Sequence, residues 1–263
     1  TLGCPEWDFE TIVSQAAQMG FGAVELRGIG QELRTERLPC FLPENRGRFR
    51  ELLREKGISI CCIGTSCCFH SPEAVPAALE EGKRALDLCA EWGIPAIRVF
   101  GDRLPPEEDP AAVVERAAGA IAELCGYGAA AGNPARVLLE IHGDFCTPEI
   151  LGQLGGKLAG WPNFGWLWDI EHGYRAGQGF APLYQAVRNR LVHVHIKDCR
   201  SGAAATLPGT GELPVEAVVR RLLEDGYDGW FSFEWEKRWQ PDILEPETAF
   251  PAYVRFMRRI AGK

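Results

Sequence analysis

The residues best suited to chemistry in this sequence are carboxylates and imidazoles that stand near the ends of short apolar runs. Four of them form the strongest candidate set: Glu140, Asp169, His195 and Glu234. Three hard oxygen ligands and one nitrogen suit Mn²⁺, Mg²⁺, Co²⁺ or Zn²⁺, with coordination positions left open for a substrate. Carboxylates that converge in a confined site repel one another and lose solvation. The set therefore predicts one divalent metal ion, unless each acid instead pairs with an arginine or lysine.

Alternation of polar and apolar residues within the runs supports this set. In the run that ends at His142, Val137, Leu139 and Ile141 have one parity, whereas Glu140 and His142 have the other. Alternate side chains of a barrel strand face the inside and the outside of the barrel. The apolar residues can therefore pack against helices while the polar residues point inward.

The same alternation recurs in three later strands. His195 and Lys197 share the inward parity of one run, Glu234 and Glu236 that of another, and Asp169 is inward in a third. In TIM barrels, active sites are built at the C-terminal ends of the strands. The alternation therefore predicts that several strands point charged side chains toward one mouth.

The elements that would position these residues alternate strictly between strand and helix. Seven β-rich runs are predicted as strands, at 23–27, 58–64, 96–101, 137–142, 164–170, 192–197 and 230–236. Eight stretches are predicted as helices, at 8–19, 45–56, 73–92, 109–131, 147–158, 180–189, 214–225 and 245–261. Strand–helix alternation over 263 residues predicts a parallel sheet in one α/β domain, 1–263. We expect a (β/α)8 TIM barrel whose first strand is truncated or very short, with Thr1-Leu2-Gly3 as its stump.

Composition excludes several classes of partner and location. A net charge of −8 and a pI near 5.3, with scattered lysines and arginines, argue against binding to nucleic acid. The longest apolar runs are too short to cross a bilayer. The chain opens without the basic and apolar regions of a signal peptide, and its ten cysteines are predicted to be reduced, buried residues. We therefore expect a cytoplasmic protein that binds neither nucleic acid nor membrane.

Six short segments, taken together and in their order along the chain, indicate a known family. They are GFGAVELR at 20–27, LEIH at 139–142, WDIEH at 168–172, VHVHIKD at 192–198, GTGE at 209–212 and GYDGWFSFE at 226–234. Together they resemble the sugar phosphate isomerase/epimerase family, the xylose isomerase-like TIM barrels, over essentially the whole chain. The resemblance implies one divalent metal held by a Glu, an Asp, a His and a Glu. These ligands lie on strands five to eight when the stump Thr1-Leu2-Gly3 is counted as strand one. The matching residues are the four that alternation selects.

The resemblance also implies roles in substrate binding. His172, three residues after Asp169, matches a histidine that contacts a substrate oxygen. Two positions depart from the pattern of the ketose epimerases. Ser201 stands where an arginine would bind substrate, with Arg200 beside it, and Cys146 replaces an acidic residue. These departures do not match a ketohexose 3-epimerase, and they leave the metal ligands unchanged.

Four other residues complete the predicted substrate-binding set. His142 would orient a ligand or contact substrate, or else support the metal site through a hydrogen bond. Lys197 would neutralise a developing oxyanion or balance the acids. Arg200 follows the predicted strand at 192–197. His70 lies on a loop after the predicted strand at 58–64, where simple solvation of the side chain is the alternative.

The predicted reaction is proton transfer on a small sugar, or on a polyhydroxy ketone or aldehyde. A metal that bridges a carbonyl and the adjacent hydroxyl would stabilise an enediolate, while Glu140 and Glu234 remove and return the proton. This predicts a metal-dependent isomerase or epimerase. A lyase of the dehydroshikimate dehydratase type is the alternative, because it uses similar ligands and expels water.

Two further functional classes fit the sequence less well. The DNA-repair endonucleases of the same fold need more histidines than the five present. A sugar-binding module without enzymatic activity would not need four metal ligands. The expected partner is a small sugar-like substrate, and a homodimer is the candidate assembly.

Overall fold

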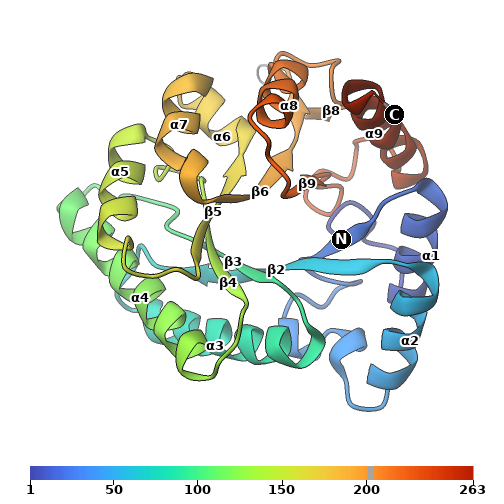
Figure 1. The fold of residues 1–263 in the computed structure, drawn as a ribbon, viewed down its shortest axis with the longest axis horizontal. Helices are drawn as coiled ribbons and strands as arrows, with labels where there is room; N and C mark the ends of the chain where they lie inside the picture. Colours follow the sequence, from blue (N-terminus) through green and yellow to red (C-terminus); the bar gives the residue numbers. More distant parts are fainter. Residues whose placement is uncertain (201–203, 263) are drawn as a thin grey trace. The chain divides into compact units, whose positions relative to one another are not determined.

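The computed structural model describes residues 1–200 and 204–262, and the strands of its main sheet follow one another in sequence order. They are β1 (Ala23–Leu26), β2 (Ser59–Cys68), β3 (Ala96–Phe100), β4 (Arg136–Glu140), β5 (Phe164–Asp169), β6 (Leu191–Ile196) and β9 (Trp230–Phe233). All seven predicted strands are therefore confirmed, with a helix between most successive pairs (Figure 1). The chain divides into two compact units: unit 1 is Thr1–Cys61 with Val194–Lys263, and unit 2 is Cys62–His193.

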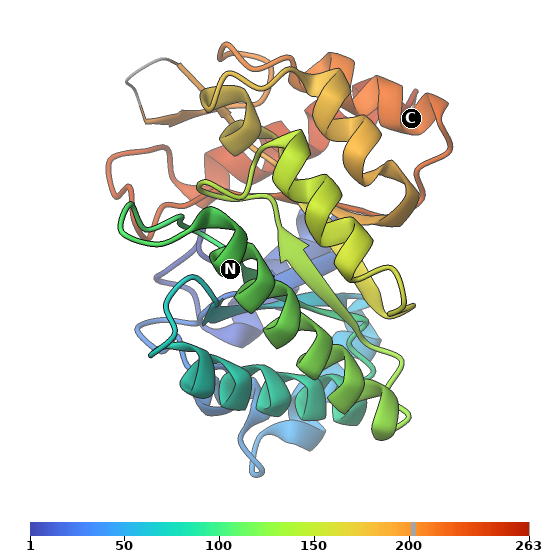
Figure 2. The same ribbon diagram turned by 90° about the vertical axis from the view of Figure 1, so that its left-hand side faces the viewer.

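Unit 2 contains parallel strands with helices packed beside them. In the register of β3, β4 and β5, Phe100 lies opposite Glu140, and Glu140 lies opposite Leu167. The unit's helices are α3 (Val75–Trp92), α4 (Pro110–Ala130), α5 (Pro148–Lys157), α6 (Ile170–Arg175) and α7 (Phe180–Val187), followed by the turn η3 (Arg188–Arg190). Helices α3, α4 and α5 lie side by side, as Figure 2 shows.

Unit 1 contains the first and last parts of the chain. Its helices are α1 (Phe9–Met19), α2 (Arg46–Lys56), α8 (Val215–Glu224) and α9 (Pro246–Ala261), with short turns η1 (Thr35–Arg37) and η2 (Pro39–Phe41). A small antiparallel pair, β7 (Asp198–Cys199) and β8 (Ala205–Thr206), follows β6. Sequence alternation did not predict this pair.

Side-chain caps explain where several helices begin. Asp8 accepts a hydrogen bond from the Thr11 amide (2.8 Å) at the start of α1, and Asp109 accepts one from Ala111 (3.0 Å) at the start of α4. The predicted Thr147 start is also confirmed, because its hydroxyl accepts from the Ile150 amide (3.3 Å). Such caps satisfy amides that have no partner within the helix.

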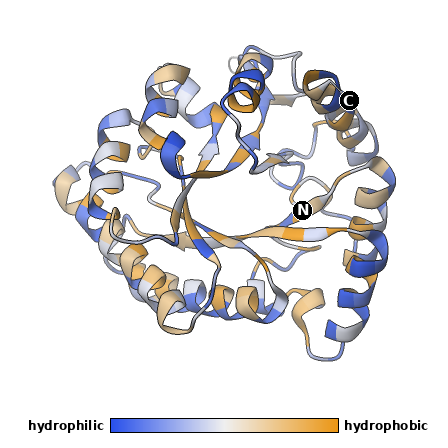
Figure 3. Cartoon of the chain, in the orientation of Figure 1, coloured by the Kyte–Doolittle hydropathy of each residue, from blue (hydrophilic) through white to orange (hydrophobic). Residues whose placement is uncertain are grey.

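Apolar side chains in unit 2 form a buried layer on the strand face that also carries Glu140. Cys62, Ala96, Leu138 and Leu167 form one buried cluster, with Val192 packed against it. Leu138 has the same parity as Glu140. Figure 3 shows apolar residues along the strands and both apolar and hydrophilic residues on the helices. The predicted parity therefore matches the packing of this face.

Two elements differ from the sequence prediction. Thr1-Leu2-Gly3 is not a regular strand, although the Thr1 amino group donates to the Glu25 carbonyl of β1 (2.8 Å) and its hydroxyl accepts from the Arg27 amide (3.1 Å). Helix α6 was not predicted, because six residues are too few to show a helical period.

The ten cysteines are free thiols, and all except the half-buried Cys68 are buried. This confirms the predicted role as small core residues for the nine buried cysteines. Among the described helices, none is both long enough and apolar enough to span a membrane.

Candidate functional site

Glu140 is the last residue of β4 and forms a buried ion pair within unit 2. Its Oε2 lies 3.2 Å from Nε of Arg98 on β3, and the two side chains are 2% and 5% exposed. The Arg98 guanidinium also lies 3.9 Å from the centroid of the Phe100 ring. Register explains the pairing, because Phe100 lies opposite Glu140 and Arg98 has the same parity two residues earlier. An arginine partner, the predicted alternative to a metal, is therefore present for this acid.

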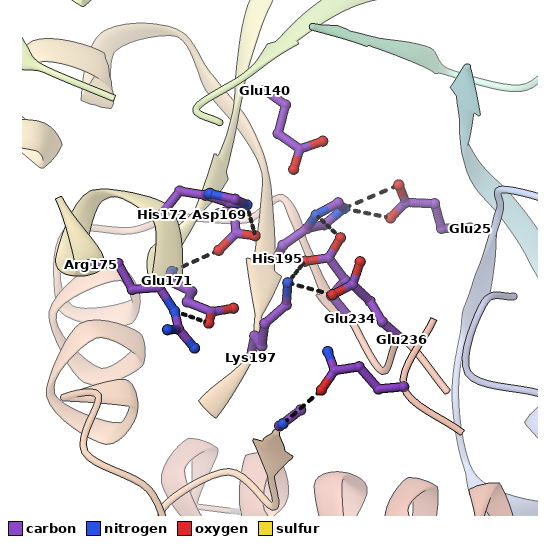
Figure 4. Close-up of polar contacts among 12 residues, drawn as sticks. Glu25, Glu140, Asp169, Glu171, His172, Arg175, His195, Lys197, Glu234 and Glu236 are labelled. Atoms are coloured by element: carbon purple, nitrogen blue, oxygen red, sulfur yellow. Dashed lines mark hydrogen bonds and ion pairs between the residues drawn. The ribbon is translucent and has the colours of Figure 1, made fainter. Parts of the chain in front are cut away.

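Asp169 ends β5 and also begins α6. The side chain is fully buried, and its Oδ1 accepts a hydrogen bond from the Glu171 amide at 2.7 Å. Because the helix starts at this residue, His172 lies one turn later, with Nε2 3.6 Å from Asp169 Oδ2 (Figure 4). Glu171 forms an ion pair with Arg175 on the same helix. The one-turn spacing of α6 thus places His172 beside Asp169.

His142 joins these residues in unit 2. Its ring centroid lies 3.9 Å from that of His172 and 4.9 Å from that of Phe100. Glu140, His142 and His172 each offer a ligand atom, and the three atoms lie within 4.8 Å of one another. His142 Nδ1 also lies 3.0 Å from Oδ1 of Asp102.

Asp102 is held by an unusual backbone geometry. Its φ of +74° is the only positive value outside glycine in the described part of the chain. The Asp102 carbonyl accepts from the Asp144 amide at 2.7 Å, and a Cβ at Gly143 would lie 2.1 Å from that carbonyl oxygen. Glycine is therefore required where the two loops meet. The hydrogen bond with His142 lowers the pKa of Asp102, and the charges of His142, His70 and Arg103 add to this effect.

His195 is the central residue of the acidic cluster in unit 1. The residue is 3% exposed, and its Nε2 lies 3.0 Å and 3.1 Å from the two carboxylate oxygens of Glu25. Its Nδ1 lies 3.4 Å from Oε1 of Glu234 (Figure 4). An ionised carboxylate only accepts hydrogen bonds, so the neutral tautomer that carries its proton on Nε2 would donate to Glu25. In this tautomer the Nδ1 lone pair faces Glu234.

Lys197 belongs to the same cluster as His195 and Glu234. Its Nζ is 2.8 Å from Glu234 Oε2 and 3.0 Å from Glu236 Oε2, and the residue is 5% exposed. Lys197, Glu234 and Glu236, which are all predicted to point inward, are therefore in contact through the Lys197 ammonium. The ammonium balances two acids, as one of the two predicted roles for Lys197 requires.

Asp198 is a buried residue that fixes the loop after β6. Its Oδ2 accepts from the amides of Gly209 (2.8 Å) and Gly211 (2.9 Å), and its Oδ1 accepts from Cys199 (2.9 Å) and Leu213 (3.2 Å). A Cβ at Gly211 would lie 2.1 Å from Asp198 Oδ1. The glycines of the GTGE segment therefore bind a carboxylate of this chain.

The remaining predicted substrate-binding residues lie in loops. Arg200 is exposed and donates to the Thr210 carbonyl at 3.0 Å and 3.3 Å. His70 follows β2 in unit 2, with Nδ1 3.8 Å from Oδ2 of Asp102. Ser201 lies outside the described residues.

Sequence reasoning did not assign Arg98 or Asp102 to these clusters, and it paired Glu25 with Arg27. Arg98 is a single charge within an apolar strand, and Asp102 lies in an irregular loop. Glu25 has inward parity, but its contact with His195 joins residues 170 positions apart. The alternation gave a signal for Glu25, whereas nothing local distinguishes Asp102 from other loop acids.

Curated relatives match only part of their length. The chain is 36% identical over 80 residues to a putative hydroxypyruvate isomerase of Streptomyces coelicolor, covering 30% of this chain and 28% of the relative. It is 28% identical over 98 residues to an inosose dehydratase of Clostridium botulinum, covering 30% and 32%. The matched segments thus span about a third or less of these relatives.

Solved structures match along almost the whole chain. A probable 3-DHS dehydratase from Bacillus anthracis superposes with a TM-score of 0.78 and 17% identity over 98% of this chain and 96% of that one. The IOLI protein with a bound zinc atom superposes with a TM-score of 0.79 and 15% identity over 99% and 95%. Sugar epimerases are also among the similar structures. At these identities the likeness shows the fold, which is a TIM barrel as predicted.

The family model described as xylose isomerase-like TIM barrel matches residues 13–260, which is most of the chain. Relatives with this fold include isomerases, epimerases and dehydratases. The chain therefore belongs to the xylose isomerase-like TIM barrel family.

Proposed function

We propose that this protein is a divalent-metal-dependent isomerase or epimerase of a small sugar, or of a polyhydroxy ketone or aldehyde. The observation that carries the proposal is the set of acids and imidazoles at the ends of β4, β5 and β6 and just after β9. Glu140, Asp169 and His195 are each at most 3% exposed. In a TIM barrel, strand ends of this kind supply the catalytic residues. The reducing environment implied by ten free thiols supports a cytoplasmic location.

Glu140 and Asp169 of unit 2 would hold the ion together with His195 and Glu234 of unit 1. The donor set fits a divalent ion of the Mn, Mg, Co or Zn group. Within unit 1, Nδ1 of His195 and Oε1 of Glu234 are two potential ligand atoms that lie 3.4 Å apart, close enough to bind one ion. When bound, the ion would polarise a carbonyl and the neighbouring hydroxyl of the substrate.

Proton transfer is assigned to Glu140 and Glu234. One carboxylate takes the proton from the carbon next to the carbonyl, and the same or the other carboxylate returns it. Lys197, 2.8 Å from Glu234, and Arg98, 3.2 Å from Glu140, would balance the charges of these acids. His172 would contact a substrate oxygen, with His142, Arg200 and His70 as further substrate-binding residues.

A dehydratase is the second candidate function, and one observation favours it. The rings of His142 and His172 lie 3.9 Å apart beside Glu140. An imidazolium at this position would protonate a departing hydroxyl group. Expulsion of water would then follow removal of the proton by the same carboxylates.

Substrate screening in deuterated water tests both functions. Ketoses, keto-inositols and hydroxypyruvate are incubated with the metal-loaded enzyme and followed by NMR and mass spectrometry. An isomerase or epimerase incorporates deuterium at carbon without net loss of water, whereas a dehydratase forms a product lighter by one water. Absence of both outcomes with every metal and substrate would contradict the proposal.

A further inference from the structure

A second group of potential ligands lies at the ends of β2 and β3 in unit 2. Cys68, His70 and Asp102 offer a sulfur, a ring nitrogen and a carboxylate oxygen that lie within 4.8 Å of one another. None of the three belongs to the set Glu140, Asp169, His195 and Glu234. Cys68 and His70 are half-buried, so a small ion can reach them.

Backbone contacts fix the three residues in place. The Phe69 amide, between the two ligands of the β2 end, donates to the Phe100 carbonyl at 3.2 Å. The Arg116 guanidinium donates to the His70 carbonyl. Asp102 is held by the Asp144 amide in its left-handed conformation. A site whose ligands are already positioned loses less entropy when it binds an ion.

The orientation of the side chains also fits an ion. His70 Nδ1 is buried and has no hydrogen-bond partner among the described residues, and it lies 3.8 Å from Asp102 Oδ2. The other oxygen of Asp102 is engaged by His142 Nδ1 at 3.0 Å. This contact matches the outer support that orients carboxylate ligands in metal sites. Oδ2 of Asp102 is therefore the oxygen turned toward His70.

We propose that Cys68, His70 and Asp102 bind a second divalent ion of the zinc class, with a fourth position open to water or substrate. Thiolate, imidazole and carboxylate are the three ligand types that zinc accepts, and tetrahedral sites with three protein ligands keep such an open position. Its three ligands are distinct from the four of the metal centre in the proposed function, and His70 would serve here as an ion ligand in place of the substrate contact proposed above.

Binding at this site replaces one proton. The Cys68 thiol loses its proton to solvent, its sulfur lone pair forms the bond to the ion, and no electron is transferred. Burial and the neighbouring Asp102 raise the pKa of this thiol to about 12, so the ion must compete with the proton.

Cobalt titration of the protein tests the proposal, because Co²⁺ replaces Zn²⁺ and reports a sulfur ligand. We expect two equivalents of Co²⁺, of which one produces a near-ultraviolet sulfur-to-cobalt charge-transfer band. The band should disappear in Cys68→Ser and His70→Ala. It should persist in Cys67→Ala, the matched control, since the Cys67 thiol donates to the Ala78 carbonyl at 3.0 Å.

A further variant separates this site from the first. His195→Ala should lose the ion that has no sulfur ligand and keep the charge-transfer band, so each proposal can fail alone. A wild-type protein without the band, or a band that persists in Cys68→Ser, would overturn the second site. If circular dichroism shows that Cys68→Ser does not fold, loss of the band in folded Asp102→Asn decides the question in the same way.

Discussion

His195 has a carboxylate beside each of its two ring nitrogens. Nε2 lies 3.0 Å from the Glu25 carboxylate, and the tautomer that donates to Glu25 presents its Nδ1 lone pair toward Glu234. Carboxylates that support a histidine in this way orient the ring and raise its basicity as a ligand. Glu25 is thus a positioning residue for the proposed metal centre.

Replacing Glu25 by glutamine should therefore weaken metal binding, although Glu25 is not one of the four proposed ligands. Glu25→Gln keeps an acceptor near Nε2 but removes the charge, and we expect about a 10- to 100-fold rise in the metal dissociation constant. Competition with a metallochromic chelator measures it. Glu51→Gln, an exposed residue of α2 that pairs with Arg54, is the matched control and should bind metal as the parent does.

The two carboxylates assigned to proton transfer should respond differently from His195. Glu140→Gln or Glu234→Gln keeps an oxygen near the ion but removes the base, so deuterium exchange should fall by about 10²-fold or more. His195→Ala should act mainly through metal occupancy and recover part of its activity at high Mn²⁺. Parent rates of exchange in both Gln variants with metal bound would identify another base, with His172 or Lys197 next to be tested.

At the scale of elements, the sequence predicts best what has a regular period. Alternation identified all seven strands and the inward faces of β4, β5 and β6, because adjacent strand residues point to opposite sides. It could not predict α6, whose first capping residue, Asp169, is also the last residue of a strand. The contact of Asp102 with His142 depends on a positive φ in a loop, which no periodic pattern reports.

Helix α1 offers a test of capping at this scale. The amide of Thr11 donates to Asp8 and lowers the pKa of its carboxyl below the ordinary value of 3.8. A lowered pKa in the folded state contributes stability above the unfolded value, and this contribution is lost as the pH falls through the folded value. At neutral pH, Asp8→Ala should lower the free energy of unfolding by about 1 kcal/mol.

The neutral cap Asp8→Asn is the matched control. It should keep most of the stability at neutral pH, because Asn caps helices about as well as Asp. The difference in urea midpoint between the parent and this variant should then change only below about pH 4, near the usual carboxyl pKa. An unchanged difference between pH 6 and pH 3 would show that the Asp8 charge does not contribute.

At the scale of the whole molecule, the chain belongs to one family of barrels although its contacts divide it into two units. The boundaries fall inside β2 and β6, so neither unit ends at a linker. Sequence reasoning predicted one domain, since nothing in its composition marks a break. The proposed metal ligands are divided equally between the two units, two in each.

Metal binding should therefore stabilise the whole chain. An ion that binds only the folded state adds about 2.7 kcal/mol at a free concentration 100 times its dissociation constant. Differential scanning fluorimetry should show a higher Tm with Mn²⁺ or Zn²⁺ than with EDTA, and His195→Ala should reduce this shift. Equal midpoints with and without each metal would contradict the proposed four-ligand centre.

The loop that Asp198 closes has a consequence for how this protein can change. Four backbone amides, from Cys199 and from residues 209 to 213, bind one buried carboxylate, so the two ends of the loop are fixed whatever lies between them. Lengthening a loop with fixed ends changes its closure entropy only slowly. Substitutions among residues 204–208 should therefore leave Asp198 and the neighbouring Lys197 in place.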